Sequence, residues 1–192
     1  MADSLAVAAV TFILADLLGE AAGALPGTRV TTLSPSADDI LDSGEPTINL
    51  WLLAASPDAA LRNAPPAGGE SGGVSARGAL PLSLSYLISC HGNEARLEPH
   101  VLLGAVAATL HGHPLLDRDL IARAIAGDVR FGAFAFASAR GPIAIRLLAA
   151  DSETIGRAWL GIPGARRRLS LLCAAGPVTV APSPPAVLAR PA

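Results

Sequence analysis

The chain has 192 residues, which is the size of one domain or of one domain with short extensions. Its 14 basic and 16 acidic side chains leave a net charge of −2, so the chain has no overall positive field to attract nucleic acid or an acidic membrane. Apolar residues make up 51 % and charged residues only 16 %. A folded chain of this composition leaves apolar surface, which we expect a partner protein or self-assembly to cover.

Two residue types narrow the chemistry further. All 14 basic residues are arginine, which excludes sites that need a lysine, such as a Walker phosphate loop or a Schiff base. The two cysteines, Cys90 and Cys173, lie far apart and neither belongs to a C-x-x-C pair. Neither a structural zinc site nor a disulfide framework is therefore expected.

The first apolar stretch, SLAVAAVTFILADLLGE, predicts a helix that begins at residue 4 or 5. Asp3 or Ser4 can cap it, and Gly19 and Gly23 end it. An aspartate interrupts the stretch well short of the ~20 apolar residues that a membrane span needs. No basic residue precedes the stretch, as one would in a secretory signal. We therefore predict a helix that packs on the core.

The next segments predict strands separated by polar chain. Residues 29–33 form a short strand, residues 34–46 a polar loop, and residues 47–55 (TINLWLLAA) a compact apolar strand. Residues 81–89 (PLSLSYLIS) alternate strictly, which predicts a strand with one apolar face and one wet or contact face. The apolar face carries Leu82, Leu84, Tyr86 and Ile88, and the other face carries Ser83, Ser85 and Ser89. We expect this strand to pair with residues 47–55.

A long arm separates those two strands. Residues 56–80 are rich in proline, glycine, alanine and serine and are predicted to be exposed, because they cannot form a core of their own. Within the arm, residues 69–73 (GESGG) match the G-x-S-x-G pattern of hydrolases. The match lacks the apolar strand before it and the helix after it that a nucleophile elbow requires. We interpret these residues as a flexible glycine hinge.

The second half of the chain predicts further helices and strands. A helix over residues 97–111 presents Leu103, Val106, Ala107 and Leu110 on one face and stops at Gly112 and Pro114. Later elements are a helix at 117–126, an ambiguous segment at 131–139, a strand at 143–148, a helix from Asp151 to Leu160 anchored by Trp159, strands at 168–174 and 177–180 separated by AAG, and a proline-rich tail at 182–192.

Together these elements predict an α+β fold. One mixed, largely antiparallel sheet is packed by the N-terminal helix and by two to three further helices. Residues 1–181 form a single domain, residues 56–80 its exposed arm, and residues 182–192 an extended or disordered tail.

The polar residues do not form a recognisable active site. The four histidines, His91, His100, His111 and His113, lack the spacing of a metal-binding pair, and His111 and His113 suit a helix C-terminus. Cys90 precedes His91, but neighbouring strand residues point to opposite faces, so we predict a buried cysteine. We expect no catalytic residue, no metal and no cofactor.

Residues 166–168 form the one dense basic cluster in the sequence. The three arginines, Arg166, Arg167 and Arg168, have no aromatic residues between them, so they are weak evidence for nucleic-acid binding. Because the guanidinium fork suits carboxylates, we predict a salt-bridged or solvated edge.

The order of these segments resembles the tail-terminator, or cap, protein family of contractile phage-tail-like injection systems. The resemblance rests on the N-terminal helix, then INLWLLAASPDAALRN at residues 48–63, LPLSLSYLISCHG at 80–92 and LEPHVLLGAVAATLHGHPLL at 97–116, and finally the Trp159 helix and RRLSLLCAAGPVTVAP at 167–182. The family often carries an acidic residue where this chain has Ser83 and Ser85, and an aromatic residue where it has Leu172 and Cys173.

The resemblance implies a structural role and no enzyme activity. Such proteins form a homohexameric ring that stacks on the last layer of the inner tube protein and meets the end of the sheath protein. It implies assembly in the cytoplasm as part of a particle that can later be released, with neither nucleic acid nor membrane as a partner.

Several residues are candidates for the interfaces of such a ring. Four surfaces can contact a neighbouring subunit: the side chains at the base of the arm, the serine face, the arginine cluster, and the strand edge at residues 168–180. The candidate residues are Arg62, Asn63, Ser83, Ser85, Arg166, Arg167 and Arg168. Two alternatives stay open: a monomeric adaptor that binds a partner by strand addition, and a small cofactor-free acyl-transfer enzyme that uses Cys90 or Ser71.

Overall fold

One six-stranded sheet organises the chain in the computed structural model, which describes residues 5–36, 44–58, 61, 80–126, 128, 131 and 142–180. The strand order is β1-β2-β3-β6-β5-β4. The strands are β1 (Arg29–Thr31), β2 (Thr47–Pro57), β3 (Leu80–His91), β4 (Leu115–Leu116), β5 (Ile143–Leu147) and β6 (Ser170–Val180). Only β1 and β2 run parallel, and every other pair is antiparallel, as the predicted mixed sheet requires.

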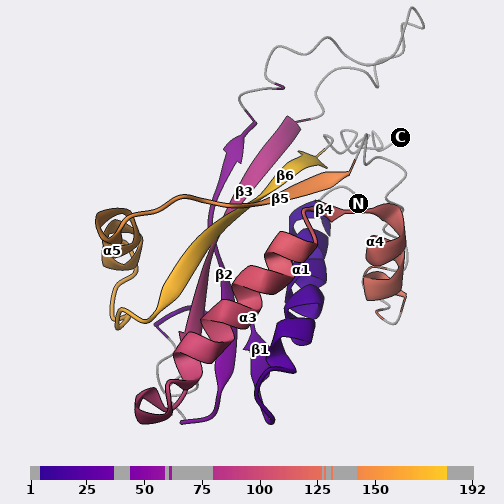
Figure 1. The fold of residues 1–192 in the computed structure, drawn as a ribbon. Helices are drawn as coiled ribbons and strands as arrows, with labels where there is room; N and C mark the ends of the chain where they lie inside the picture. Colours follow the sequence, from indigo (N-terminus) through magenta and orange to yellow (C-terminus); the bar gives the residue numbers. More distant parts are fainter. Residues whose placement is uncertain are drawn as a thin grey trace, which may run out of the picture.

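Helices cover both faces of this sheet (Figure 1). Helix α1 (Ala6–Ala22) and helix α3 (Glu98–Gly112) lie side by side on one face, where α4 (Arg118–Ile125) packs beside α1. Among the described residues, helix α5 (Ser152–Leu160) is the one helix on the other face. A short 3-10 helix, η3 (Glu94–Arg96), leads from β3 into α3. The α+β class predicted from the sequence is confirmed.

The main core lies between α1, α3 and the sheet. Apolar side chains of α1 recur at helical spacing and are buried against the strands, because that stripe faces the sheet. The predicted apolar face of β3 is confirmed, since Leu84, Tyr86 and Ile88 are fully buried there. The Tyr86 hydroxyl lies 2.9 Å from the Thr11 hydroxyl of α1, so the one buried tyrosine keeps a hydrogen-bond partner.

The ends of α1 differ from the prediction. The helix continues through Gly19 and ends at Gly23. A glycine costs about 1 kcal/mol within a helix, but the neighbouring Leu17, Leu18 and Ala21 are buried, and their packing outweighs that cost. The residue before the helix is Leu5, whose side chain makes no capping bond, and the two predicted caps lie outside the described residues. No helix within the described ranges is long and apolar enough to cross a membrane.

Helix α3 is present as predicted, but its buried stripe is rotated by about one residue. The buried positions are Pro99, Leu102, Val106 and Leu110, whereas Leu103 is only half-buried. The helix contacts α1 and the strands β3 and β5 at once, so the contacts of the whole element set its rotation and local spacing does not. It also extends through Gly112, one residue beyond the predicted end.

Strand β6 replaces the two final strands that the sequence predicts. The pairing of β6 with β3 shifts between Leu82 and Leu84, so that Gly176 and Pro177 together oppose Ser83. A Cβ on Gly176 would lie 3.1 Å from the Leu82 carbonyl oxygen, so the backbones approach closely there. A bulge is one of the few places in a sheet where proline and glycine are tolerated. The AAGP segment is therefore a bulge within one strand and not a turn between two.

Helix α5 closes part of the second face as predicted. The Asp151 carboxylate accepts a hydrogen bond of 2.8 Å from the Thr154 N–H, which caps the helix and lowers the pKa of Asp151. Trp159 is buried against Leu87 and Leu172, and its indole N–H donates to the Ser170 hydroxyl at 3.0 Å. This second, smaller cluster holds α5 on the sheet.

The predicted arm is shorter at both ends than expected. Strand β2 reaches Pro57 and β3 begins at Leu80, so both ends of the segment 56–80 belong to the sheet. The Asp58 N–H donates to the Pro81 carbonyl at 2.8 Å, which extends the pairing by one residue. Most of the arm, the ambiguous segment after Phe131 and the tail at 182–192 lie outside the described residues.

Candidate functional site

The predicted contact edge at residues 168–180 is wrong, because β6 is not an edge strand. It lies between β3 and β5 in the sheet. The outermost strands are β1 and β4, which are three and two residues long. Strand order depends on contacts between distant segments, so the pattern of one segment does not show whether it lies at an edge. The two edges of the sheet must therefore be considered from the structure.

At one edge, β1 covers only a small part of β2. It pairs with Thr47, Ile48 and Asn49, the first three of the eleven residues of β2. Figure 1 shows β2 continuing well past β1 along the sheet. Among the described residues, none has residues 50–57 as its register partner on the outer side of β2. We call these eight residues the free edge.

The side chain of Asn49 fixes where β1 leaves β2. It is fully buried, and its carbonyl oxygen accepts from the Thr31 hydroxyl at 2.8 Å and from the Leu33 N–H at 3.0 Å. Its amide donates to the Leu33 carbonyl at 3.1 Å. Both backbone groups of Leu33 are thus satisfied by one side chain, so the chain can turn away while the outer side of β2 stays open.

The free edge is apolar and carries no charge. Its sequence is LWLLAASP, in which residues 51–53 are half-buried and residues 54–57 are exposed. Natural sheets commonly protect an edge with lysine, other charges, proline or a bulge. Here the devices are a bulge between Leu52 and Ala54 and a terminal Pro57. The free edge therefore has the apolar composition of a strand that is paired on both sides, although it lies at the edge of the sheet.

The serine face of β3 is only partly exposed. Ser83 and Ser85 are half-buried on the face opposite α1 and α3, and Ser85 lies between Ala54 and Ala174 in the register. Ser89 is buried, and its hydroxyl lies 3.0 Å from Nε2 of His91. The prediction that all three serines share a wet face is wrong for Ser89, because α5 and its Trp159 cover the sheet around the neighbouring Leu87.

The arginine cluster lies between α5 and β6. Arg168 Nη1 is 3.9 Å from Glu94 Oε1, and Arg167 donates to the Ser152 carbonyl at 3.5 Å, while Arg166 is exposed. Two of the three arginines thus contact η3 and the start of α5 within the chain. These contacts agree with the predicted salt-bridged or solvated edge. That the arginines contact a partner protein stays a prediction.

Cys90 and His91 do not form a nucleophile and base pair. Cys90 is buried among the side chains beneath α1 and α3, where burial raises the pKa of its thiol to about 12. The His91 imidazole bonds Ser89 on the opposite face of the sheet. Ser71, Arg62 and Asn63 lie outside the described residues.

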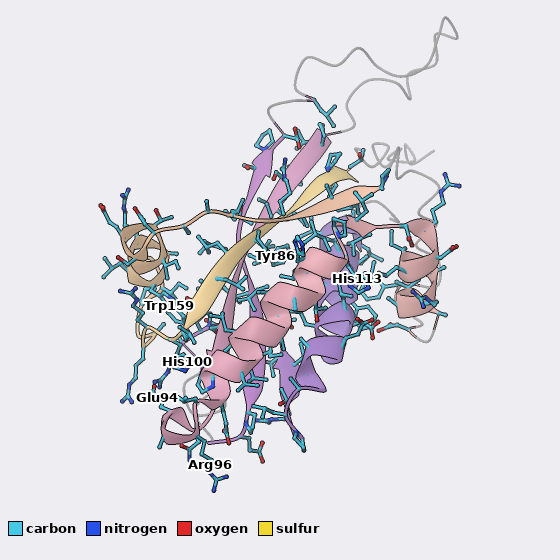
Figure 2. The ribbon with its side chains drawn as sticks, viewed as in Figure 1. Tyr86, Glu94, Arg96, His100, His113 and Trp159 are labelled. Atoms are coloured by element: carbon cyan, nitrogen blue, oxygen red, sulfur yellow. The ribbon has the colours of Figure 1, made fainter. Side chains whose placement is uncertain are left out.

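The remaining histidines are distributed along α3. Figure 2 shows His100 and His113 at opposite ends of that helix. The His113 Nδ1–H donates to the Thr109 carbonyl at 3.0 Å, and His113 Nε2 lies 3.9 Å from a Glu20 carboxylate oxygen of α1. His111 lies in the last turn, as expected for a residue that favours a helix C-terminus. Within the described ranges, no three histidine, cysteine or acidic side chains gather where a metal ion could bind.

Comparison with known proteins identifies the family of the chain. The model of the Pvc16 N-terminal domain matches residues 9–192. The chain belongs to the Pvc16 N-terminal domain family. No curated protein sequence is similar to this member of the family.

Two solved structures are similar to this Pvc16 N-terminal domain. One is the sheath/tube terminator of PVC, an extracellular contractile injection system, in its extended state. It is 15 % identical with a TM-score of 0.60, and the match covers 97 % of this chain and 60 % of the terminator, which shows a shared fold. The other is the tube-terminating cap of the anti-feeding prophage, at 17 % identity and a TM-score of 0.43, covering 78 % of this chain and 50 % of the cap.

Sequence reasoning missed the free edge and the role of Asn49. The signal was present in the sequence, since an asparagine interrupts the apolar strand TINLWLL and needs hydrogen-bond partners when buried. What those partners are depends on residues 31–33, which the sequence alone does not place beside β2. The family resemblance stated from the order of the motifs agrees with the family found here.

Proposed function

We propose that this chain is a structural cap that ends the inner tube and the sheath of a contractile phage-tail-like injection particle. The observation that carries the proposal is the family match over residues 9–192. It is supported by the fold that 97 % of the chain shares with a sheath/tube terminator. The chain spans 60 % of the length of that terminator, and the partners of the whole protein are part of the proposal.

The cap acts as a ring of six copies that sits on the last layer of tube protein and meets the end of the sheath. Contacts between unlike surfaces generate a closed ring when their rotation completes a circle. The two sides of such a ring differ, and growth stops if only one side matches the tube. Six weak contacts made together hold the cap firmly, because each bound copy raises the effective concentration of the next.

The candidate contacts with the ring neighbours, tube and sheath are those predicted from the sequence. They are Arg62, Asn63, Ser83, Ser85, Arg166, Arg167 and Arg168. Exposed leucines add apolar surface that a partner can cover, among them Leu147 and Leu160. The cap assembles in the cytoplasm as part of the particle and leaves the cell where the particle is released.

The cap carries out no chemistry in this proposal. Cys90 and Cys173 are both buried, and burial raises the pKa of each thiol to about 12, so neither is an available thiolate at neutral pH. This disfavours a cysteine acyl-transfer enzyme. A monomeric adaptor is the second candidate, and the free edge of β2 favours it, because an exposed edge can pair with a partner strand.

The decisive experiment compares particles from a strain that lacks the chain with particles from the same strain complemented by the wild-type chain. The first prediction is that uncapped particles have tubes of variable length with open or frayed ends, as seen by electron microscopy. Complementation restores a narrow length distribution and a blunt end. Tubes of uniform length with intact blunt ends in the absence of the chain would overturn the proposal.

A further inference from the structure

The hydrogen bonds at the two ends of β2 fix which backbone groups face outward. The N–H of Arg29, the first residue of β1, donates to the Pro46 carbonyl at 3.0 Å, so the Pro46 carbonyl points away from β3. The Asp58 N–H donates to the Pro81 carbonyl at 2.8 Å, so Asp58 faces β3. Along a strand, the N–H and C=O of successive residues alternate between the two sides.

Counting inward from both ends identifies the donors of the free edge. From Pro46 the outward residues before the bulge include Leu50 and Leu52, and from Asp58 they include Pro57 and Ala55. The count is consistent because the bulge between Leu52 and Ala54 inserts one extra residue. Pro57, which has no N–H, occupies an outward position, as proline does at sheet edges. The N–H of Leu50 faces Thr31, the last residue of β1, so the free edge presents two N–H groups, from Leu52 and Ala55.

We propose that the free edge of β2 receives an extended, proline-free segment of a different protein, which adds to the sheet as an extra strand in line with β1. The proposal rests on the proposed function, in which that protein is a component of the particle. Eight residues at about 3.3 Å each give a docking line of roughly 26 Å. The backbone groups supply the affinity, and the uncharged LWLLAASP sequence favours apolar side chains on the incoming strand.

The other edge of the sheet argues against a second copy as the donor of this strand. There β4 pairs with Ile143 and Ala144 of β5, and the Pro114 carbonyl accepts from the Ile145 N–H at 2.8 Å. Among the described residues, that edge offers no free stretch to match eight residues of β2. Pairing of two β2 strands with each other would be two-fold and would close a dimer, which does not generate a ring.

The second prediction uses Ala55→Pro with Ala55→Ser as its matched control. Ala55 is exposed, and its N–H faces away from β3, so proline removes one edge donor and leaves the pairing with β3 intact. Serine keeps the donor. Loss of one backbone hydrogen bond weakens incorporation of the chain into particles by up to about tenfold, measured as copies of the chain per particle. Circular dichroism and denaturant unfolding check that both variants fold.

Hydrogen exchange of the unmodified chain provides a test that does not depend on a variant. In a peptide spanning residues 50–57, the outward amides of Leu52 and Ala55 exchange rapidly in the free chain and slowly in assembled particles, whereas the peptide over α5 serves as the reference. Equal exchange in both states, or equal incorporation of the proline and serine variants, would overturn the inference while the capping role stands. Protection of the edge in a free dimer would assign it to a second copy instead. Absence of the chain from particles would overturn both proposals together.

Discussion

Asn49 shows how one side chain determines the shape of a sheet edge. Its carboxamide oxygen accepts from the Thr31 hydroxyl and from the Leu33 N–H, and its nitrogen donates to the Leu33 carbonyl. If residue 32 had paired with residue 50, β1 would have continued along β2. Instead the side chain ends the pairing without leaving buried polar groups unsatisfied.

The third prediction concerns this side chain. Asn49→Ala leaves the backbone groups of Leu33, which is half-buried, without their partner, and we expect the free energy of unfolding to fall by about 1–3 kcal/mol. The matched control is Asn93→Ala, because Asn93 accepts a single bond from the Arg96 N–H in an exposed position. Urea unfolding of both variants provides the measurement. Equal losses for the two asparagines would contradict the role given to Asn49.

At the scale of one element, α5 depends on a single large anchor. Trp159 is buried against Leu87 and Leu172, whereas its neighbour Leu160 is 86 % exposed. Because the two residues are adjacent in the same helix, comparing their alanine variants distinguishes the effect of burial from the effect of helix propensity.

The fourth prediction compares truncation of these neighbours. Trp159→Ala removes a buried aromatic side chain and its bond to Ser170, so the free energy of unfolding falls by about 3–5 kcal/mol. Leu160→Ala changes it by no more than about 0.5 kcal/mol, because little area is lost from the core. Denaturant unfolding followed by far-ultraviolet circular dichroism measures both. Similar losses for the two variants would mean that α5 is held by something other than Trp159.

Elements with strong local signals were predictable from the sequence. The alternation of β3 and the helical segments predicted at 117–126 and 151–160 are local patterns, and the structure has a strand and two helices there. The bulge at Gly176, the continuation of α1 through Gly19 and the rotation of α3 were not predictable in this way. Each depends on a contact with a segment distant in the sequence, which overrides local preference.

The candidate site was less predictable than the fold. Strand order decides that β2 has a free edge and that β6 lies between two other strands, and no pattern within either strand contains that information. The two faces of the sheet also differ because α5 covers one part only, so Ser89 is buried and Ser85 is half-buried. The family was predictable from the order of motifs, because that order is a property of the whole chain.

At the scale of the whole molecule, the two sides of the sheet are unlike. In the part of the chain that the structure describes, three helices and the main core occupy one side, and one short helix occupies part of the other. An assembly of such subunits in a ring has two different surfaces. In the cap that we propose, one of these surfaces binds the tube and the other presents nothing for further growth.

The fifth prediction separates a ring from a monomeric adaptor. We expect the purified chain to associate into a ring in the presence of tube ends, giving six copies at each capped end. Light scattering of the chain alone and single-particle imaging of capped tubes measure the two states. A chain that stays monomeric and ignores tubes would count against the cap, whereas a monomer that joins a partner strand without forming a ring would favour the adaptor.

The burial of both thiols bears on where such a particle can work. Cys90 and Cys173 are each enclosed in the interior, and their protonated form is strongly favoured. Oxidants and disulfide exchange act on accessible thiolates. A chain built this way can pass from a reducing to an oxidising medium with both thiols unchanged, which suits the release of the particle that we propose.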